Sequence, residues 1–305
     1  MKIFLLPLLS FFAFLIVFST VAQAETFALS SGKLLVATLN HTTIVSSAND
    51  DFGQPVESAQ APETEEILGS TPALSPDRSQ IAYDRAGLCV VDISGKNVRQ
   101  LTDDIGGTSP SWSPDGKRLA YATQSRAIHL INVNGSGSRA LTKNDGCTQP
   151  SWSSDGKWIA FIRDGKVAIM DVNGMNRRTI YSSSDARRPS LSADNRWILF
   201  AEGGHRRDEE RIGGPDGERV RYYSEVFRVR TDTPKGARVF IEKVSPPETD
   251  CDNPCWSPDG KWIAFDGSKG GEGYKLSNLM VARADGSDFR QLTNSLFDLH
   301  YPSWR

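Results

Sequence analysis

One segment decides the fold of this chain: Pro110-Ser-Trp-Ser-Pro-Asp-Gly-Lys-Arg-Leu-Ala-Tyr121. Close copies begin at Pro150 and Pro254, and weaker copies begin at Pro72 and Pro189. The first four of these prolines are about forty residues apart, which is the period of a four-stranded propeller blade. The sequence therefore predicts an all-β propeller.

Each repeat predicts four short strands. The Pro-Ser-Trp segment is the innermost strand, and Ser-Pro-Asp-Gly forms a tight turn after it, because Pro presets φ and Gly tolerates the left-handed region. A continuous apolar run gives the second strand, and the third ends in Asn-Gly or Asp-Gly, the pairs favoured in two-residue hairpin turns. The fourth strand carries Arg-x-Leu-Thr, with copies or looser copies at Arg99, Arg139, Arg178, Arg238 and Arg290.

The two ends of the chain complement each other. The chain ends His300-Tyr-Pro-Ser-Trp-Arg305, an innermost strand with nothing after it, and the segment from Phe27 to Ala37 supplies what should follow one. We therefore expect a six-bladed propeller over residues 25–305, with four-stranded antiparallel blades and a closing blade shared between the N- and C-termini. The alternative is an open array with frayed ends.

The N-terminus predicts the compartment. Lys2 precedes an almost wholly apolar run, and Ala22-Gln23-Ala24 supplies the small residues that a signal peptidase reads. We expect residues 1–24 to be a cleaved signal peptide, with an uncleaved anchor as the alternative, and the protein to be periplasmic or secreted. No other stretch reaches the roughly 20 apolar residues that a membrane span needs.

Composition and motifs argue against several classes of function. Lys and Arg total 35 against 37 Asp and Glu, so nucleic acid is not an expected partner. The chain has no Gly-x-Ser-x-Gly motif, and His41, His129, His205 and His300 show no ligand spacing. We expect no enzyme activity, no cofactor and no metal.

The repeat unit resembles that of the TolB propeller family, over roughly residues 27 to 305. The resemblance implies a periplasmic, monomeric scaffold that binds a protein partner, with a peptidoglycan-associated lipoprotein as the first candidate. The separate N-terminal domain of TolB has no counterpart here, so roles of that domain do not carry over. Related repeats in polysaccharide lyases leave a second hypothesis open, a propeller that binds or cleaves envelope or environmental glycans.

Partner-binding residues are expected on one face of the propeller, where loops lead from each outer strand to the next inner strand. The candidates on these loops are Asp103, Asp104, Lys143, Asp145, Arg187, Arg188, Asp250, Asp298 and His300. Blade four carries an insertion at 204–220 on the same face, which is either a recognition hairpin or a solvated loop. The whole irregular stretch, from Gly203 to Tyr223, adds Arg206, Arg207, Tyr222 and Tyr223 as candidates.

The cysteines offer a further expectation. Cys251 and Cys255 flank Asp-Asn-Pro in the loop expected to enter blade five, and an oxidising compartment would let them form a disulfide. Cys147 stands at the same offset from its proline as Cys251, so other pairings stay open.

Overall fold

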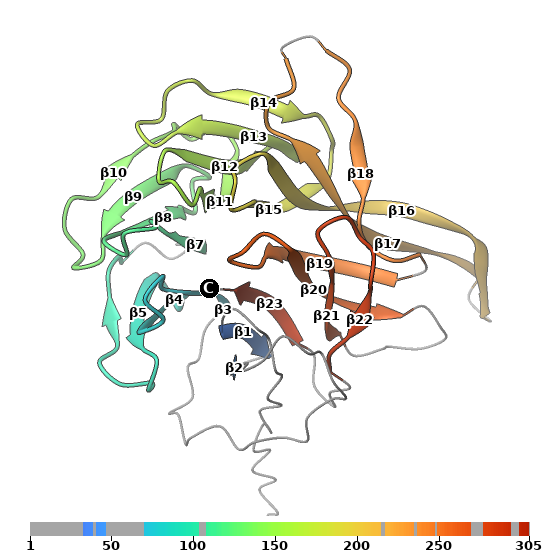
Figure 1. Cartoon of the computed structure of the whole chain (residues 1–305), viewed down its shortest axis with the longest axis horizontal. Coiled ribbons are helices and arrows are strands. Elements are labelled where there is room, and N and C mark those ends of the chain that lie inside the picture. Colours follow the sequence, from blue (N-terminus) through green and yellow to red (C-terminus); the bar gives the residue numbers. More distant parts are fainter. Residues whose placement is uncertain are drawn as a thin grey trace, which may run out of the picture.

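The computed structural model describes residues 33–38, 41–46, 70–103, 108–214, 217–234, 237–247, 249–269, 277–293 and 299–304. Their regular secondary structure is entirely β, and the sheets are arranged around a centre (Figure 1). No helix in these ranges is long and apolar enough to cross a membrane. The predicted signal peptide, residues 1–24, lies outside the described residues.

Five of the sheets are four-stranded antiparallel blades. Blade one contains β3 (Ser70–Leu74), β4 (Gln80–Asp84), β5 (Leu88–Asp92) and β6 (Arg99–Gln100), and blade two contains β7 (Thr108–Trp112), β8 (Arg118–Ala122), β9 (Ile128–Asn132) and β10 (Arg139–Ala140). Blade three contains β11 (Cys147–Trp152), β12 (Trp158–Arg163), β13 (Lys166–Asp171) and β14 (Arg178–Tyr181). Blade four contains β15 (Ala186–Leu191), β16 (Trp197–Gly214), β17 (Gly217–Arg230) and β18 (Ile241–Lys243), and blade five contains β19 (Thr249–Trp256), β20 (Trp262–Lys269), β21 (Asn278–Arg283) and β22 (Arg290–Gln291).

The expectation of six four-stranded blades is wrong, because the structure has five. The sheet that joins the chain ends has three strands among the described residues, in the order β2-β1-β23. β1 (Lys33–Thr38) pairs antiparallel with both β2 (His41–Ser46) and β23 (Leu299–Trp304). The sequence between β2 and β3 contains no arginine and no copy of Arg-x-Leu-Thr, the motif that forms the outer strand of the full blades.

The arginine and the threonine of the Arg-x-Leu-Thr motif have separate structural roles. The arginine ties its blade to the next one: Arg99 and Arg139 donate to the carbonyl oxygens of Val133 and Val172, at 3.1 and 3.2 Å. The threonine hydroxyl accepts a bond from the backbone N–H that begins the third strand, as Thr142 does from Ile128 at 2.9 Å. The motif therefore both completes a blade and joins it to its neighbour.

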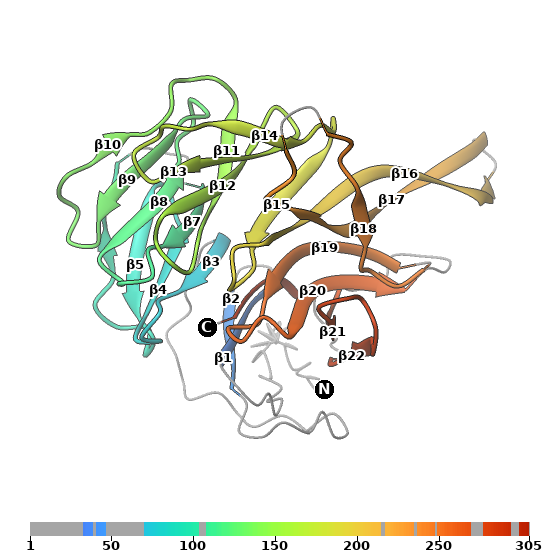
Figure 2. The same cartoon turned by 45° about the horizontal axis from the view of Figure 1, so that its top comes forward.

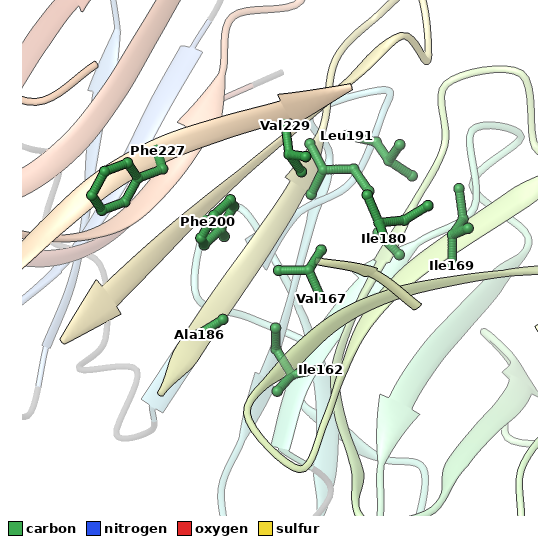
Figure 3. Close-up of a cluster of buried hydrophobic side chains, with 11 residues drawn as sticks. Ile162, Val167, Ile169, Ile180, Ala186, Leu191, Phe200, Phe227 and Val229 are labelled. Atoms are coloured by element: carbon green, nitrogen blue, oxygen red, sulfur yellow. The ribbon is translucent and has the colours of Figure 1, made fainter. Parts of the chain in front are cut away.

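The hydrophobic core lies between the blades. On β12, Ala160 and Ile162 pack toward blade four, while Ile159 and Phe161 pack toward blade two. Figure 3 shows the cluster between blades three and four, where Val167 of β13 lies near Phe200 and other side chains of blade four. Each fully buried aliphatic or aromatic side chain of this kind contributes about 1.5–3 kcal/mol, which explains why the second strand is apolar on both faces.

Candidate functional site at the channel mouth

A cavity of about 350 Å³ runs along the inner strands of the five blades and along β23. It extends from the residues that precede the repeat prolines to the Ser-Pro-Asp-Gly turns at the other end of each inner strand. We call the first end, where the loops lead into the inner strands, the mouth face, and the second end the turn face. The cavity is the channel of the propeller.

A ring of six equivalent residues surrounds the channel at the mouth face, one residue before the repeat proline of each inner strand. The ring consists of Thr71, Ser109, Gln149, Arg188, Asn253 and Tyr301. All six have a positive φ, between 50° and 57°. A residue before proline is normally extended, and the left-handed region is costly for residues other than glycine, so such strain persists only where the surrounding structure imposes it.

Hydrogen bonds join members of this channel ring across blades. The backbone N–H of Ser109 donates to Thr71 Oγ1 at 3.1 Å, and that of Arg188 donates to Gln149 Oε1 at 2.8 Å. Arg188 also reaches across the channel, where its Nη1 donates to Ser109 Oγ at 2.8 Å and its guanidinium lies 4.6 Å from the ring centroid of Tyr301. Sequence reasoning missed the ring as a set, although each member is marked by the proline that follows it.

A second cluster anchors the base of the blade-four hairpin. Arg187 Nε donates to Asp252 at 2.8 Å, its Nη1 pairs with Asp185 at 3.0 Å, and its Nη2 donates to the hydroxyl of Ser224 on β17. The backbone N–H of Ser224 in turn donates to Asp250 at 2.8 Å. Burial lowers the pKa of Arg187, but the two carboxylates outweigh it and raise the pKa overall. The cluster ties the base of the hairpin to β15 of blade four and β19 of blade five.

Asp266 and His300 form a third polar contact near the mouth. His300 Nδ1 lies 3.0 Å from Asp266 Oδ2, and Asp266 is 3% exposed. Burial raises the pKa of Asp266, and the contact with His300 offsets only part of that rise. The sequence did not single out Asp266, because Asp84 follows the second-strand apolar run in the same way in blade one.

Other predicted partner residues lie at the mouth face in different environments. Asp103 and Lys143 are exposed. Asp145 is half-buried and pairs within the protein, with Arg177 at 2.6 Å and with Arg163 at 3.5 Å. Arg187, Asp145 and Asp250 therefore hold the scaffold together, whereas Lys143 and Asp103 remain accessible to a partner.

The predicted insertion is an extension of the second and third strands of blade four. β16 and β17 pair from Trp197↔Arg230 out to Gly214↔Gly217, and the hairpin extends far beyond the rest of the blade (Figures 1 and 2). The candidates Arg206, Arg207, Tyr222 and Tyr223 all lie on these two strands. Asp104 and Asp298 lie outside the described residues.

The predicted Cys251–Cys255 disulfide is not formed, since all four cysteines are free thiols. Both residues lie on β19 rather than in a loop, and an extended strand separates residues four apart by about 13 Å. A disulfide needs Cα atoms within about 7 Å of each other. Cys251 is fully buried and burial raises the pKa of its thiol, whereas Cys255 is half-buried and lines the channel.

No group of three or more His, Cys, Asp or Glu residues able to hold a metal ion occurs within the described ranges. What the chain does present is a ring of strained residues around a channel, polar clusters at one mouth and a long hairpin beside it. These features define a β-propeller whose loops and hairpin are gathered on one face.

The comparisons identify the family. A model of the TolB beta propeller domain matches residues 56–212, so the chain belongs to the TolB beta propeller family. No curated protein sequence matches the chain.

Solved structures with a similar fold include two TolB-type proteins. The chain aligns with TolB from Acinetobacter baumannii at a TM-score of 0.65 and 20% identity, over 90% of this chain and 66% of that one. It aligns with a TolB candidate from Agrobacterium tumefaciens at 0.61 and 21%, over 88% and 91%. An oligogalacturonate lyase in complex with manganese gives 0.51 and 15%, over 72% and 64%. At these identities the likeness is one of fold.

Proposed function

We propose that this protein is a non-catalytic scaffold of the periplasm or the secreted space that binds a protein partner on its mouth face. The observation that carries the proposal is the β16–β17 hairpin, which departs from the repeat and is fixed at its base by Arg187. Membership of the TolB family supports the proposal, and a peptidoglycan-associated lipoprotein is the first candidate partner.

The pairing of the hairpin supports a binding role. β15 pairs with β16 only as far as Glu202, and β18 pairs with β17 only from Phe227 to Val229. Beyond these points, β16 and β17 pair with no described strand except each other. A two-stranded ribbon is marginally stable alone, and its unpaired outer edges offer backbone groups to an added strand of a partner.

The test uses a shortened hairpin. Replacing residues 207–221 with Asn-Gly closes the hairpin directly after the Arg206↔Tyr222 pair, with a turn sequence suited to a two-residue connection. We expect the mature protein to bind the soluble domain of the peptidoglycan-associated lipoprotein from the same organism by calorimetry. We expect the shortened variant to lose at least about tenfold in affinity, or roughly 1.4 kcal/mol, while keeping its melting temperature.

A matched control lies at the other end of the propeller. Lys157 is exposed at the turn face, and Lys157→Ala should leave the affinity unchanged. Undiminished binding by the shortened variant would contradict a role for the hairpin. If instead no periplasmic or outer-membrane protein binds but a glycan does, the carbohydrate-binding alternative would replace the scaffold proposal.

A further inference from the structure

We propose that the channel mouth binds a carboxylate, supplied by an acidic side chain of the protein partner, and that Arg188 is the residue that pairs with it. This inference rests on the proposed function and specifies the chemistry of the partner at its centre. The carboxylate site lies in the channel, whereas the proposed function depends on the β16–β17 hairpin beside the channel mouth.

Arg188 is held in place before any ligand arrives. Its backbone lies in the left-handed region and is tied to Gln149, and its side chain is held by Ser109 and by the ring of Tyr301. These contacts use one of the five guanidinium N–H donors. No carboxylate among the described residues pairs with Arg188. The remaining donors are therefore fixed in position and open to a ligand.

The rest of the channel leaves this charge uncompensated. Of the described side chains that line the cavity, Arg188 is the one with a charge, and the others are mainly proline, serine and tryptophan. Neighbouring Arg187 differs, because Asp252 and Asp185 already neutralise it. A planar guanidinium matches a carboxylate in a bidentate geometry, and a partly enclosed site strengthens the pair relative to water.

The side chains that line the channel favour the carboxylate of a peptide over the carboxylate of a sugar acid. The channel tryptophans Trp152, Trp256 and Trp304 are 5–6% exposed, because they pack between blades. The ring of Tyr301 lies under Arg188. The faces of these tryptophans are thus covered and Arg188 occupies one face of Tyr301, whereas a glutamate or aspartate side chain needs only the guanidinium and the volume of the cavity.

The experiment compares two capped peptides, acetyl-Gly-Gly-Glu-Gly-Gly-amide and its glutamine counterpart, on the mature protein. Binding is measured by calorimetry and by protection of Cys255, the channel thiol, from alkylation. We expect the glutamate peptide to bind about tenfold more tightly than the glutamine peptide. We expect Arg188→Gln to abolish this preference, Arg188→Lys to keep part of it, and Lys157→Gln, which removes an exposed charge at the turn face, to keep all of it.

Several outcomes would overturn the inference. Equal binding of the two peptides would do so, as would an unchanged preference in Arg188→Gln. Digalacturonate that binds through Arg188 while the glutamate peptide does not would replace the peptide ligand with a sugar acid. If Arg188→Gln does not fold, the reduced preference of Arg188→Lys decides the matter.

The outcomes also separate this inference from the proposed function. The hairpin-shortened variant should keep the full peptide preference, because its channel ring is intact. Partner binding without a peptide preference would overturn the carboxylate site alone. A peptide preference without any protein partner would overturn the scaffold proposal alone.

Discussion

Residues at equivalent positions of the repeat make different hydrogen bonds in different blades. Trp112 and Trp152 both end an inner strand, and both are nearly fully buried, at 2% and 5% exposure. The indole N–H of Trp112 donates to the carbonyl oxygen of Ala73 in the preceding blade at 2.9 Å. The corresponding group of Trp152 has no partner among the described residues. Trp256 repeats the bond of Trp112, since its indole N–H donates to the carbonyl oxygen of Ser190 at 3.0 Å. The repeat motif thus fixes packing, while the hydrogen bond forms at some blade junctions and not at others.

This difference gives a matched pair of substitutions. Trp112→Phe should destabilise the protein by about 1 kcal/mol more than Trp152→Phe, because only the first leaves a buried carbonyl oxygen without its donor. The free energy of unfolding from urea titrations measures both. Equal losses, or a larger loss for Trp152→Phe, would show that the indole hydrogen bond does not contribute to blade docking.

At the scale of elements, the turns at the turn face share one hydrogen-bond pattern. In blade two, the Ser113 hydroxyl donates to Asp115, whose carboxylate also accepts the backbone N–H of Lys117 at 3.1 Å. In blade one, Ser75 donates to Asp77 at 2.6 Å. The hydrogen bond from the serine is the main cause that lowers the pKa of Asp115 and of Asp77. The carboxylate form therefore stabilises the turn.

The sign of the pH dependence follows from these lowered pKa values. A carboxyl group whose pKa is lower in the folded protein than in the unfolded chain stabilises the fold at any pH above its unfolded pKa, near 3.8. This stabilisation is lost as the pH falls through the pKa that the group has in the folded protein. The variant with Asp77→Asn and Asp115→Asn should thus be less stable than the wild type at pH 7. The difference in melting temperature between the variant and the wild type should disappear below about pH 4. A difference in melting temperature that does not change with pH would show that the two carboxylates do not stabilise these turns.

The elements were predictable where local chemistry repeats and not where it departs from the repeat. The inner-strand motif, the serine–aspartate turn and Arg-x-Leu-Thr predicted the five blades, since each satisfies a local geometric demand. The Cys251–Cys255 disulfide failed because the segment is a strand, which the proline between the two residues concealed. The hairpin at 204–220 was recognised as an insertion, but its pairing depends on contacts that charge-rich sequence does not specify.

At the scale of the whole molecule, the sheet that joins the two ends of the chain was harder to predict than the blades. β1 pairs with β23 across nearly the full length of the chain, but complementarity of the two ends does not determine how many strands the joining sheet contains. Arg-x-Leu-Thr occurs three times, with looser copies at Arg178 and Arg238, and these five positions correspond to the five four-stranded blades. Members of the channel ring come from all six sheets, so no local window of sequence reveals their convergence.

Two lysines at opposite ends of one strand test most directly whether a protein partner binds the mouth face. Lys143 lies on the loop that leads into β11, at the mouth face, and Lys157 lies on the turn that follows β11, at the turn face. Both are exposed. A photo-crosslinking benzoylphenylalanine at each position in turn, activated in living cells, reports which face a partner covers.

We expect a specific protein adduct from position 143 and none from position 157. That adduct should disappear when the hairpin is shortened. Adducts of equal yield from both positions, an adduct from position 157 alone, or no adduct from either position would contradict binding of a partner at the mouth face.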